Sequence, residues 1–515
     1  MTGADLLCDT LLVNGVDVCF ANPGTSEMAF VAALDRKPQM RCILGLFEGV
    51  VTGAADGYGR MTGRPAATLL HTGPGLANGL ANLHNARRAR TPVVNIVGDH
   101  ASHHLKYNAP LTTDIESLAR PMSDWVRRAS GPSDVGVCAE ATIVAARTTP
   151  GVATMILPAD AAWGDVGTVT ARKIDVPAMR VVEDRQVTAV AETMRGHRGR
   201  IGIVLGGEAA WADGIEVAAR VAEAAGARLF SEVLPARVSR GRHLPDVTRI
   251  PYPPEMARAV LKDIDLLVLC GCEEPVAFFA YPGKPSRIVS EQCEVVTLAA
   301  KGDDKLQVLR SLADLLGAKP APPTRVIAPY EGLPSGSLTE DAIAVVLAQL
   351  MLENTVMAEE ALTSAQRLYA LGASSAPHDY MMVTGGSIGI GPPLATGAAV
   401  ACPDRKVINL QADGSGMYTL QALWTQARER LDVLTIICNN GAYAILKREM
   451  ANLGVNDIGR NARRMIEFDD PPLDWVSLAK GMGVEGARAD TCERFADLVR
   501  SGVARKGPFL IEAMI

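Results

Sequence analysis

The sequence lacks the features that mark a membrane protein or a nucleic-acid-binding protein. No uninterrupted apolar run reaches the roughly 18 residues of a membrane span, and residues 1–12 have neither a basic stretch nor a long apolar stretch. Aromatic residues make up only 4% of the 515 residues, which argues against stacking platforms for single-stranded nucleic acid. The formal net charge of −6 gives no basic excess. We therefore expect a cytoplasmic protein with no nucleic-acid and no membrane partner.

Cysteine pairing and cysteine-based metal sites are also missing. The ten cysteines include no C-x-x-C pair, and most of them lie in apolar runs. Reduced cysteines packed in a core are typical of cytosolic proteins. This pattern excludes a disulfide framework as the basis of the fold.

Short apolar runs that alternate with amphipathic segments fill most of the chain. Strands are expected at residues 41–46, 66–70 and 91–97, and again at 201–205, 266–270, 406–411 and 433–438. This alternation predicts an α/β fold of three doubly wound parallel-sheet domains, at residues 1–172, 187–318 and 338–515. Residues 176–185 and the Pro-rich residues 319–334 are expected to be the linkers.

The sharpest chemical signal lies in the third block. One predicted strand ends in Ala412-Asp413-Gly414-Ser415, and the next ends in Asn439-Asn440-Gly441. Parallel neighbouring strands would place Asp413 and Asn440 together at their carboxyl ends, where open α/β sheets bind ligands. One carboxylate and one amide oxygen suit Mg²⁺, which completes its coordination from phosphates and water. The alternative reading is a pair of ordinary turns, because Asp-Gly and Asn-Gly are common turn dipeptides.

This pair of segments resembles the thiamine diphosphate motif of thiamine-dependent enzymes, in which a GDG sequence is followed by an NN pair. The chain has Ala412 where that family usually has glycine. The resemblance implies that Asp413, the side chain of Asn440 and the backbone carbonyl of Ala442 hold Mg²⁺. It also implies that the cofactor is bound by the residues around them, which are Gly414, Ser415 and Tyr443.

A second segment, in the first block, resembles the catalytic glutamate segment of the same family. Glu48 follows a predicted strand and opens a predicted helix. The resemblance implies that Glu48 protonates the aminopyrimidine ring of the cofactor, which then generates the C2 ylid, the nucleophile of the reaction. From its position alone, Glu48 could equally be an acidic residue favoured by the helix dipole.

The Gly-rich loop at residues 384–393 is similar to the loop that bends the cofactor in these enzymes. By this resemblance Ile388 is the bulky residue beneath the cofactor, and the Gly386 carbonyl accepts from the aminopyrimidine. A Gly-rich helix entry is the alternative.

The three blocks run in the order of pyruvate-oxidase-type thiamine enzymes, and two branches look similar. The overall pattern is most like that of acetolactate synthase large (catalytic) subunits. Thr25, Glu48 and His71 match active-site positions of benzoylformate decarboxylase, so Thr25 and His71 are expected to be catalytic with Glu48. The second histidine of that decarboxylase is not evident, because Phe279 stands where it would fall. The segment His100-Ala-Ser-His-His104 has no role in this scheme.

Three aliphatic residues are expected to line the substrate pocket by the same resemblance: Leu362, Ile445 and Leu446. They predict an apolar acyl substituent. Acetolactate synthases also bind FAD, but the central block is short and has no convincing dinucleotide motif, so FAD is not favoured.

These observations predict a thiamine diphosphate- and Mg²⁺-dependent 2-oxo acid decarboxylase and carboligase, acetolactate synthase-like, that acts through a C2 ylid and an enamine. The alternatives are a benzoylformate decarboxylase-like enzyme that does not ligate, a 2-hydroxyacyl-CoA or oxalyl-CoA type lyase, and a non-catalytic cofactor-binding partner of a true synthase. The resemblance also implies a homodimer or homotetramer whose active sites lie at the subunit interface.

Overall fold

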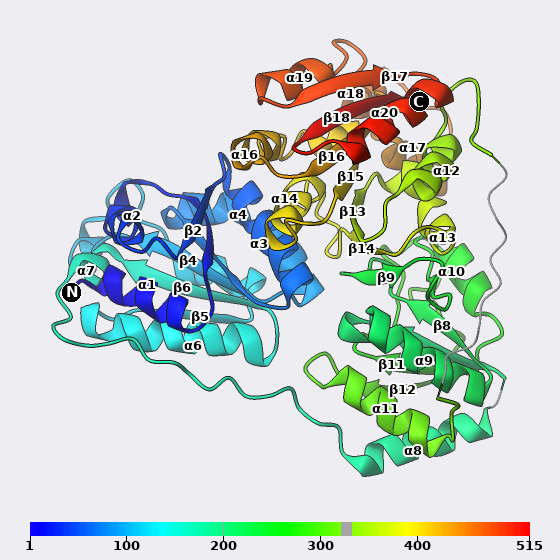
Figure 1. Cartoon of the computed structure of the whole chain (residues 1–515), viewed down its shortest axis with the longest axis horizontal. Coiled ribbons are helices and arrows are strands. Elements are labelled where there is room, and N and C mark those ends of the chain that lie inside the picture. Colours follow the sequence, from blue (N-terminus) through cyan, green and yellow to red (C-terminus); the bar gives the residue numbers. More distant parts are fainter. Residues whose placement is uncertain (198, 321–331) are drawn as a thin grey trace.

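The computed structural model describes residues 1–197, 199–320 and 332–515. Three parallel-dominated sheets, each flanked by helices, follow one another along the chain, as the sequence predicts. In Figure 1 the N-terminal block lies at the left, the central block at the lower right and the C-terminal block at the upper right. Among the described residues, no helix combines the length and the apolarity needed to cross a membrane.

The N-terminal block contains a six-stranded sheet with the order β2-β1-β3-β4-β6-β5, and all its pairs are parallel. Its strands are Val18–Asn22 (β1), Arg41–Leu44 (β2), Ala66–Leu70 (β3), Val93–Asp99 (β4), Trp125–Arg128 (β5) and Val152–Pro158 (β6). Its helices are Gly3–Val13 (α1), Met28–Asp35 (α2), Glu48–Thr62 (α3), Thr72–Ala89 (α4), Ile115–Ala119 (α5), Val135–Thr148 (α6) and Ala159–Trp163 (α7). The strand order reverses direction between β1 and β3, which makes that point the expected ligand crevice of this sheet.

The central block has a five-stranded parallel sheet with the order β10-β8-β7-β11-β12. Its strands are Ile201–Leu205 (β7), Ala227–Ser231 (β8), Thr248–Arg249 (β10), Leu266–Cys270 (β11) and Glu294–Ala299 (β12). Its helices are Asp184–Gly196 (α8), Ala212–Ala225 (α9), Pro254–Leu261 (α10) and Lys305–Leu315 (α11). Residues 164–183, which contain most of the predicted first linker, run as an extended segment to α8 along the lower edge of the molecule in Figure 1. Most of the predicted second linker falls on residues 321–331, outside the described residues.

The C-terminal block has a seven-stranded sheet with the order β17-β18-β16-β15-β13-β14-β9. Its strands are Val238–Arg240 (β9), Thr355–Glu360 (β13), His378–Met382 (β14), Val407–Ala412 (β15), Val433–Asn439 (β16), Glu485–Ala489 (β17) and Phe509–Met514 (β18). Its helices are Glu340–Leu350 (α12), Leu368–Gly372 (α13), Gly391–Ala401 (α14), Asp413–Gly416 (α15), Ala422–Glu429 (α16), Ala444–Asn452 (α17), Arg460–Ile466 (α18), Trp475–Gly481 (α19) and Cys492–Ala504 (α20).

Strand β9 corrects the prediction of a purely parallel third sheet. Its residues belong to the central block in sequence, yet β9 pairs antiparallel with β14 at the edge of the C-terminal sheet. The pairing places Arg240 opposite His378. A three-residue strand gives no readable alternation pattern, so the sequence offered no signal for it. This pairing connects the central block to the C-terminal sheet through backbone hydrogen bonds.

Helices α3 and α14 join the N-terminal and C-terminal blocks at very close range, and Figure 1 shows them side by side. The close approach depends on glycine at the contact. A Cβ atom on Gly57 would lie 2.1 Å from the backbone oxygen of Leu394, and one on Gly397 would lie 1.8 Å from that of Ala54. No side chain fits there, because real Cβ contacts are far longer. This contact fixes the start of α3, where Glu48 lies, relative to the loop before α14.

Candidate functional site

Asp413 lies at the carboxyl end of β15, next to the end of β16, as the sequence predicts. The two strands pair in parallel, with Ala412 opposite Cys438. The Asp413 carboxylate is buried and accepts three backbone hydrogen bonds, from Gly414 at 2.8 Å, Asn440 at 3.1 Å and Gly441 at 2.7 Å. Burial raises the pKa of Asp413, and these N–H donors oppose that shift. The carboxylate is thus held in one orientation at the edge of the sheet.

Asn440 and Ala442 sit beside it in a tight turn. The Asn440 side-chain oxygen accepts a hydrogen bond of 3.0 Å from the backbone N–H of Ala442, and Gly441 between them has a φ of +64°. Glycine fits here because the left-handed region is costly for other residues. Tyr443 follows, and its ring packs so closely that a Cβ on Gly414 would lie 2.5 Å from it. The turn gathers a carboxylate, an amide oxygen and backbone carbonyls within a few residues.

The carboxylate of Asp413, the amide oxygen of Asn440 and the backbone carbonyls are suitable ligands for a hard cation, which would take its remaining ligands from water and phosphate. In the described part of the chain no basic side chain forms an ion pair with Asp413, so the buried carboxylate has no protein counter-charge. Oxygen ligands with a single carboxylate match Mg²⁺ held with a diphosphate. Ser415 lies just behind the carboxylate, where its hydroxyl accepts a 2.8 Å hydrogen bond from the side chain of Gln411.

A buried glutamate, Glu360, anchors the Gly-rich loop before α14. Its carboxylate accepts hydrogen bonds from the N–H groups of Gly389 and Gly391, each at 2.6 Å, and from Ile390 at 3.3 Å. Burial raises the pKa of Glu360 to about 7, against these hydrogen bonds. Glu360 could not be singled out from the sequence, because a carboxylate at the end of a strand gives the same pattern whether it binds backbone or a ligand. Its role here is to hold the segment that carries Ile388.

The predicted substrate residues meet in one cavity of about 440 Å³. Leu362, Ile445 and Leu446 all line it, together with Gly386 and Ile388 of the loop. Leu362 has a φ of +48°, and its N–H donates a 3.0 Å hydrogen bond to the buried Glu359. A volume of this size lies in the range of small-molecule sites.

Aromatic side chains from the central block close the same cavity. Phe278, Phe279 and Tyr252 line it, and the Phe278 ring contacts Phe279 edge-on with centroids 4.9 Å apart. A Cβ on Gly386 would lie 2.4 Å from the Phe278 ring, so glycine is needed where the loop passes beneath it. From the sequence, only the replacement of the expected histidine by Phe279 is evident. The phenylalanines make this part of the wall apolar, while charged side chains, among them Arg249, Arg448 and Glu449, line other parts of the cavity.

Glu48 opens α3 at the far side of the N-terminal sheet's crevice. It is 9% exposed and accepts a 3.0 Å hydrogen bond from the Asn78 side chain of α4. A Cβ on Gly75 would lie 3.2 Å from the Glu48 carboxylate and 3.4 Å from Cβ of His71, so these two residues flank the first turn of α4. Asn78 was not foreseen, although its place one helical turn after Gly75 is a readable signal.

His71 is oriented by an acidic partner of its own. Its Nδ1 lies 2.9 Å from the Glu27 carboxylate and 3.1 Å from the Ser26 hydroxyl. Thr25 begins the short helix Thr25–Glu27 and lines a cavity of about 350 Å³ together with His71 and His100. The structure therefore brings Thr25, His71 and Glu48 to one region of the N-terminal block. Among the described residues, no hydrogen bond joins Glu48 or His71 to the C-terminal block.

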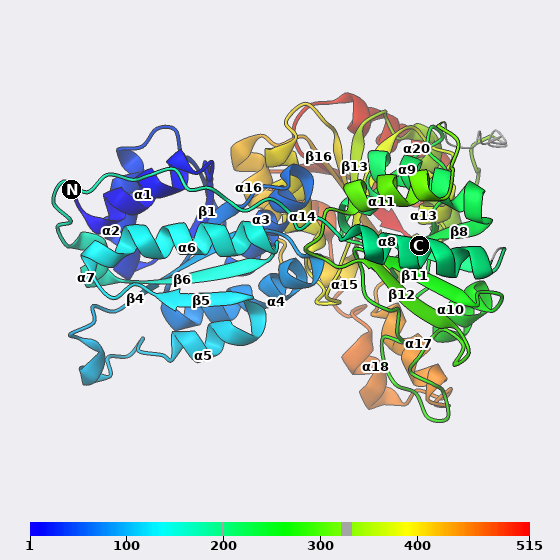
Figure 2. The same ribbon diagram turned by 90° about the horizontal axis from the view of Figure 1, so that it is seen from below.

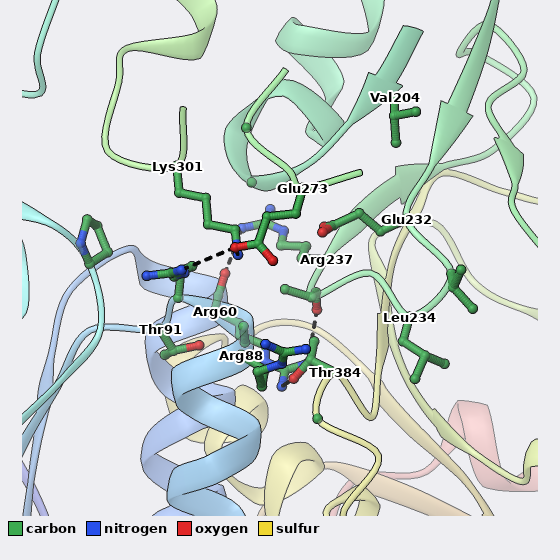
Figure 3. A pocket seen from close by; sticks show the side chains of 18 of the residues that line it. Arg60, Arg88, Thr91, Val204, Glu232, Leu234, Arg237, Glu273, Lys301 and Thr384 are labelled. Carbon is green, nitrogen blue, oxygen red and sulfur yellow. Dashed lines mark hydrogen bonds and ion pairs between the residues drawn. The ribbon is translucent and has the colours of Figure 1, made fainter. Parts of the chain in front are cut away.

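A further cavity, of about 390 Å³, lies where the three blocks meet (Figure 3). Basic side chains from two blocks face it, including Arg88 of α4 and Lys301, and Lys301 pairs with Glu273 at 2.7 Å. Glu232 also lines it, and burial raises the pKa of that carboxyl to about 7. No basic cluster of this kind is visible in the sequence, because its members lie far apart along the chain.

Comparisons with known proteins agree with this geometry. Residues 1–118 match the N-terminal TPP (thiamine pyrophosphate) binding domain of thiamine pyrophosphate enzymes, and residues 363–513 match the C-terminal TPP binding domain. IlvX of Mycobacterium tuberculosis, a protein named after the acetolactate synthase large subunit, is 48% identical over 100% of this chain and 99% of its own length. Benzoylformate decarboxylase of Pseudomonas aeruginosa is 27% identical over 97% of this chain and 96% of its own.

A solved structure shares the fold over nearly the whole chain. The thiamine diphosphate-dependent 4-hydroxybenzoylformate decarboxylase of Rhodococcus jostii superposes with a TM-score of 0.87 and 24% identity, covering 99% of this chain and 98% of that one. The two TPP binding domains coincide with the blocks that carry Glu48 and Asp413. The chain therefore belongs to the thiamine pyrophosphate enzyme family, as a thiamine pyrophosphate-dependent enzyme of the acetolactate synthase and benzoylformate decarboxylase group.

Proposed function

We propose that this enzyme decarboxylates a 2-oxo acid with an apolar acyl substituent and transfers the acyl unit to a carbonyl acceptor, in the manner of an acetolactate synthase. The observation that carries the proposal is the 440 Å³ cavity, which is lined by Leu362, Ile445 and Leu446 beside Ile388. Its aliphatic and aromatic residues provide an apolar surface for the acyl substituent, and the charged residues that also line the cavity, such as Arg249 and Arg448, leave room for a polar group elsewhere in it.

The cofactor is held by the C-terminal block in this proposal. Asp413, the Asn440 side-chain oxygen and the Ala442 carbonyl would hold Mg²⁺, and Gly414, Ser415 and Tyr443 would contact the cofactor beside it. Gly386 and Ile388, in the loop that Glu360 fixes, would contact the rings of the cofactor. When bound, thiamine diphosphate supplies a carbon nucleophile and an electron sink for cleavage beside a carbonyl.

The N-terminal block supplies the proton-handling groups. Glu48, held by Asn78, places its carboxyl group in a nearly buried position where it would hydrogen-bond to the aminopyrimidine. His71, held by Glu27, and Thr25 lie nearby and are suited to exchange protons with the oxygens of the substrate. Because the hydrogen bonds of the two groups stay within their own blocks, we propose that Glu48 of one subunit meets Asp413 of another in a homodimer or a larger homo-oligomer.

The test is CO₂ release by the purified protein with thiamine diphosphate and Mg²⁺. The panel contains pyruvate, 2-oxobutyrate, 4-methyl-2-oxopentanoate and benzoylformate, with and without an aldehyde acceptor. Release with an acyloin product supports the proposal, and release with only an aldehyde product supports a decarboxylase that does not ligate. Glu48→Gln is the matched inactive control. No release from any acid, by protein that binds the cofactor, contradicts the proposal and favours a non-catalytic partner.

The cavity at the junction of the three blocks supports a second candidate, an acyl-CoA type lyase. Such an enzyme needs a surface for the ADP part of coenzyme A. Six basic side chains line this cavity against four glutamates, and Lys301 is paired with one of these, Glu273. The same cavity is a candidate place for FAD, which the sequence does not favour. Calorimetry with coenzyme A, ADP and FAD distinguishes these ligands, and an Arg88→Gln, Lys301→Gln double variant is the control for binding at this place.

A further inference from the structure

The segment His100–His104, which the proposed mechanism leaves unused, lies in the 350 Å³ cavity beside His71. The cavity opens at the carboxyl ends of three neighbouring strands of the N-terminal sheet: Thr25 follows β1, His71 and Thr72 follow β3, and His100 follows β4. Strand order reverses between β1 and β3, so this is the crevice at which such a sheet binds ligands.

Two polar atoms in this cavity have no partner in the described part of the chain. The Thr72 hydroxyl belongs to a residue with 0% exposure, and the Nε2 atom of His100 is buried although the residue as a whole is half-buried. Buried polar atoms without a hydrogen bond are uncommon, because folding removes their hydrogen bonds to water without replacing them. Both atoms can donate a hydrogen bond and both residues line the same cavity, so a bound acceptor explains them together.

The surroundings favour an acceptor with negative charge. Thr72 begins α4, an 18-residue helix whose first N–H groups have no partner inside the helix and carry partial positive charge. The acidic residues nearby are already engaged. Glu27 accepts from Gly24 and lies against His71 and Ser26, and Asp99 pairs with Arg128 at 2.6 Å. Asp160 accepts from Ser102.

The side chains next to this cavity indicate what kind of anion binds there. Glu48 and His71 flank the first turn of α4, and His71 faces the same cavity. An anion bound between Thr72 and His100 thus lies beside the groups assigned to proton transfer. A 2-oxo acid carries a carboxylate next to its reacting carbonyl, and its apolar end needs a separate place such as the 440 Å³ cavity.

We propose that Thr72 and His100 form the subsite that binds the carboxylate of the 2-oxo acid before decarboxylation. This inference rests on the proposed function, since it assigns the carboxylate of that substrate. The loop after β4 then provides a histidine that the central block, with Phe278 and Phe279 at the cavity, does not.

The first test measures binding without turnover. The probes are lactate and mandelate, which keep the carboxylate but have a hydroxyl in place of the 2-oxo group. Their amides, which carry no charge, are the controls. Binding is measured by calorimetry on the full-length protein with thiamine diphosphate and Mg²⁺. We expect the acids to bind at least tenfold more tightly than the amides. His100→Phe and Thr72→Val should each weaken acid binding about tenfold to a hundredfold, because charge-assisted hydrogen bonds are lost. His100→Gln, which keeps a donor, should restore much of it.

Control variants and a second readout keep this test decisive. His243→Phe alters an exposed histidine of the loop after β9 and should change nothing. In kinetics, His100→Phe should raise KM for the 2-oxo acid at least tenfold, while the self-ligation of an aldehyde, which has no carboxylate, stays within twofold. Circular dichroism and cofactor affinity report folding, and Thr72→Val carries the test if His100→Phe misfolds.

Several results overturn the inference. Equal binding of acid and amide, unchanged acid binding in both variants, or tighter binding of inorganic phosphate than of either acid would each do so. Failure of the proposed function looks different: no CO₂ release by the wild type, while acid binding still depends on His100, leaves the anion subsite in place and removes only its assignment to a 2-oxo acid.

Discussion

The Glu360 carboxylate accepts a 2.6 Å hydrogen bond from the backbone N–H of Gly391, at the first residue of α14. A second bond of 2.6 Å, from Gly389, makes the carboxylate a clamp on the loop that carries Ile388. The end of β13 thereby sets the position of the loop beneath the proposed cofactor site. Three backbone N–H groups of the loop and the side chain of Gln411 hold this carboxylate, so Glu360 positions the loop.

Replacing Glu360 with glutamine should loosen this clamp. The amide presents an NH₂ group to one of the backbone donors, which leaves a buried N–H without an acceptor and costs about 1–3 kcal/mol. We expect a lower melting temperature and weaker thiamine diphosphate binding, both measured on the same preparations. Glu353→Gln, at a side chain that is 64% exposed, is the control and should change stability by less than about 0.5 kcal/mol. Equal behaviour of the two variants would show that the clamp is dispensable.

The raised pKa of Glu360 also predicts a pH dependence of stability. Burial raises this pKa from 4.5 to about 7, so the folded protein binds a proton between these values that the unfolded chain releases. The stabilising contribution is complete below pH 4.5 and is lost as pH rises through 7. Glu232, with a pKa raised to about 7, acts in the same direction, so the difference between wild type and Glu360→Gln is the quantity to follow.

Melting temperatures of the cofactor-free proteins at pH 5, 6, 7 and 8 provide that difference. The wild type should lose stability relative to Glu360→Gln across this range. A difference that stays constant with pH would mean that Glu360 titrates near its ordinary value. Glu353→Gln, carried through the same series, should run parallel to the wild type.

Much of the fold follows from local patterns. The predicted bounds of β3, β7 and β11 agree with the structure, because each is a buried apolar run that ends at a polar or glycine residue. Helix α3 also begins at Glu48 as predicted, after Phe47 in an extended conformation, and it ends before Gly63, which has a φ of +67°. Strands β5, β9, β10, β14 and β17 were missed: β9 and β10 are short, β5 and β17 are half-exposed, and β14 begins with the polar residues His378 and Asp379.

Site residues could be predicted from the sequence only where the residue type and its place at a strand end together indicate a ligand. Asp413 and Asn440 were placed correctly side by side, because consecutive parallel strands end at the same edge of a sheet. Glu360 and the Thr72–His100 pair could not be foreseen. Their importance depends on which backbone or cavity they face, and that is decided by packing between segments far apart in the chain.

The apolar cavity predicts a change of substrate preference on truncation of its walls. Leu362→Ala and Ile445→Ala should each shift the ratio of kcat/KM toward larger acyl groups by about 10-fold to 200-fold, since one or more methylenes of wall are removed. The measurement is competition between 2-oxobutyrate and 4-methyl-2-oxopentanoate. Leu453→Ala, at an exposed position just after α17, is the control. Unchanged preference in both wall variants would remove these residues from the substrate pocket.

The proposed pairing of Glu48 from one subunit with Asp413 from another can be tested by complementation. Glu48→Gln and Asp413→Asn should each be inactive alone, with activity lowered by at least about 10²-fold, because one removes the acid and the other the metal carboxylate. In a mixed dimer, one active site would receive both substitutions and the other would receive neither. Co-expression of the two variants should therefore restore about a quarter of wild-type activity, since half of the dimers are mixed and each has one intact site.

A site formed within one subunit predicts the opposite result. If Glu48 and Asp413 of the same subunit form one site, every site in the mixture carries one substitution and no activity returns. Co-expression of Glu48→Gln with Glu48→Gln under a second tag is the matched control and should remain inactive in either case. Mixed dimers isolated through both tags should reach about half of wild-type activity, which separates true complementation from contamination by wild-type protein.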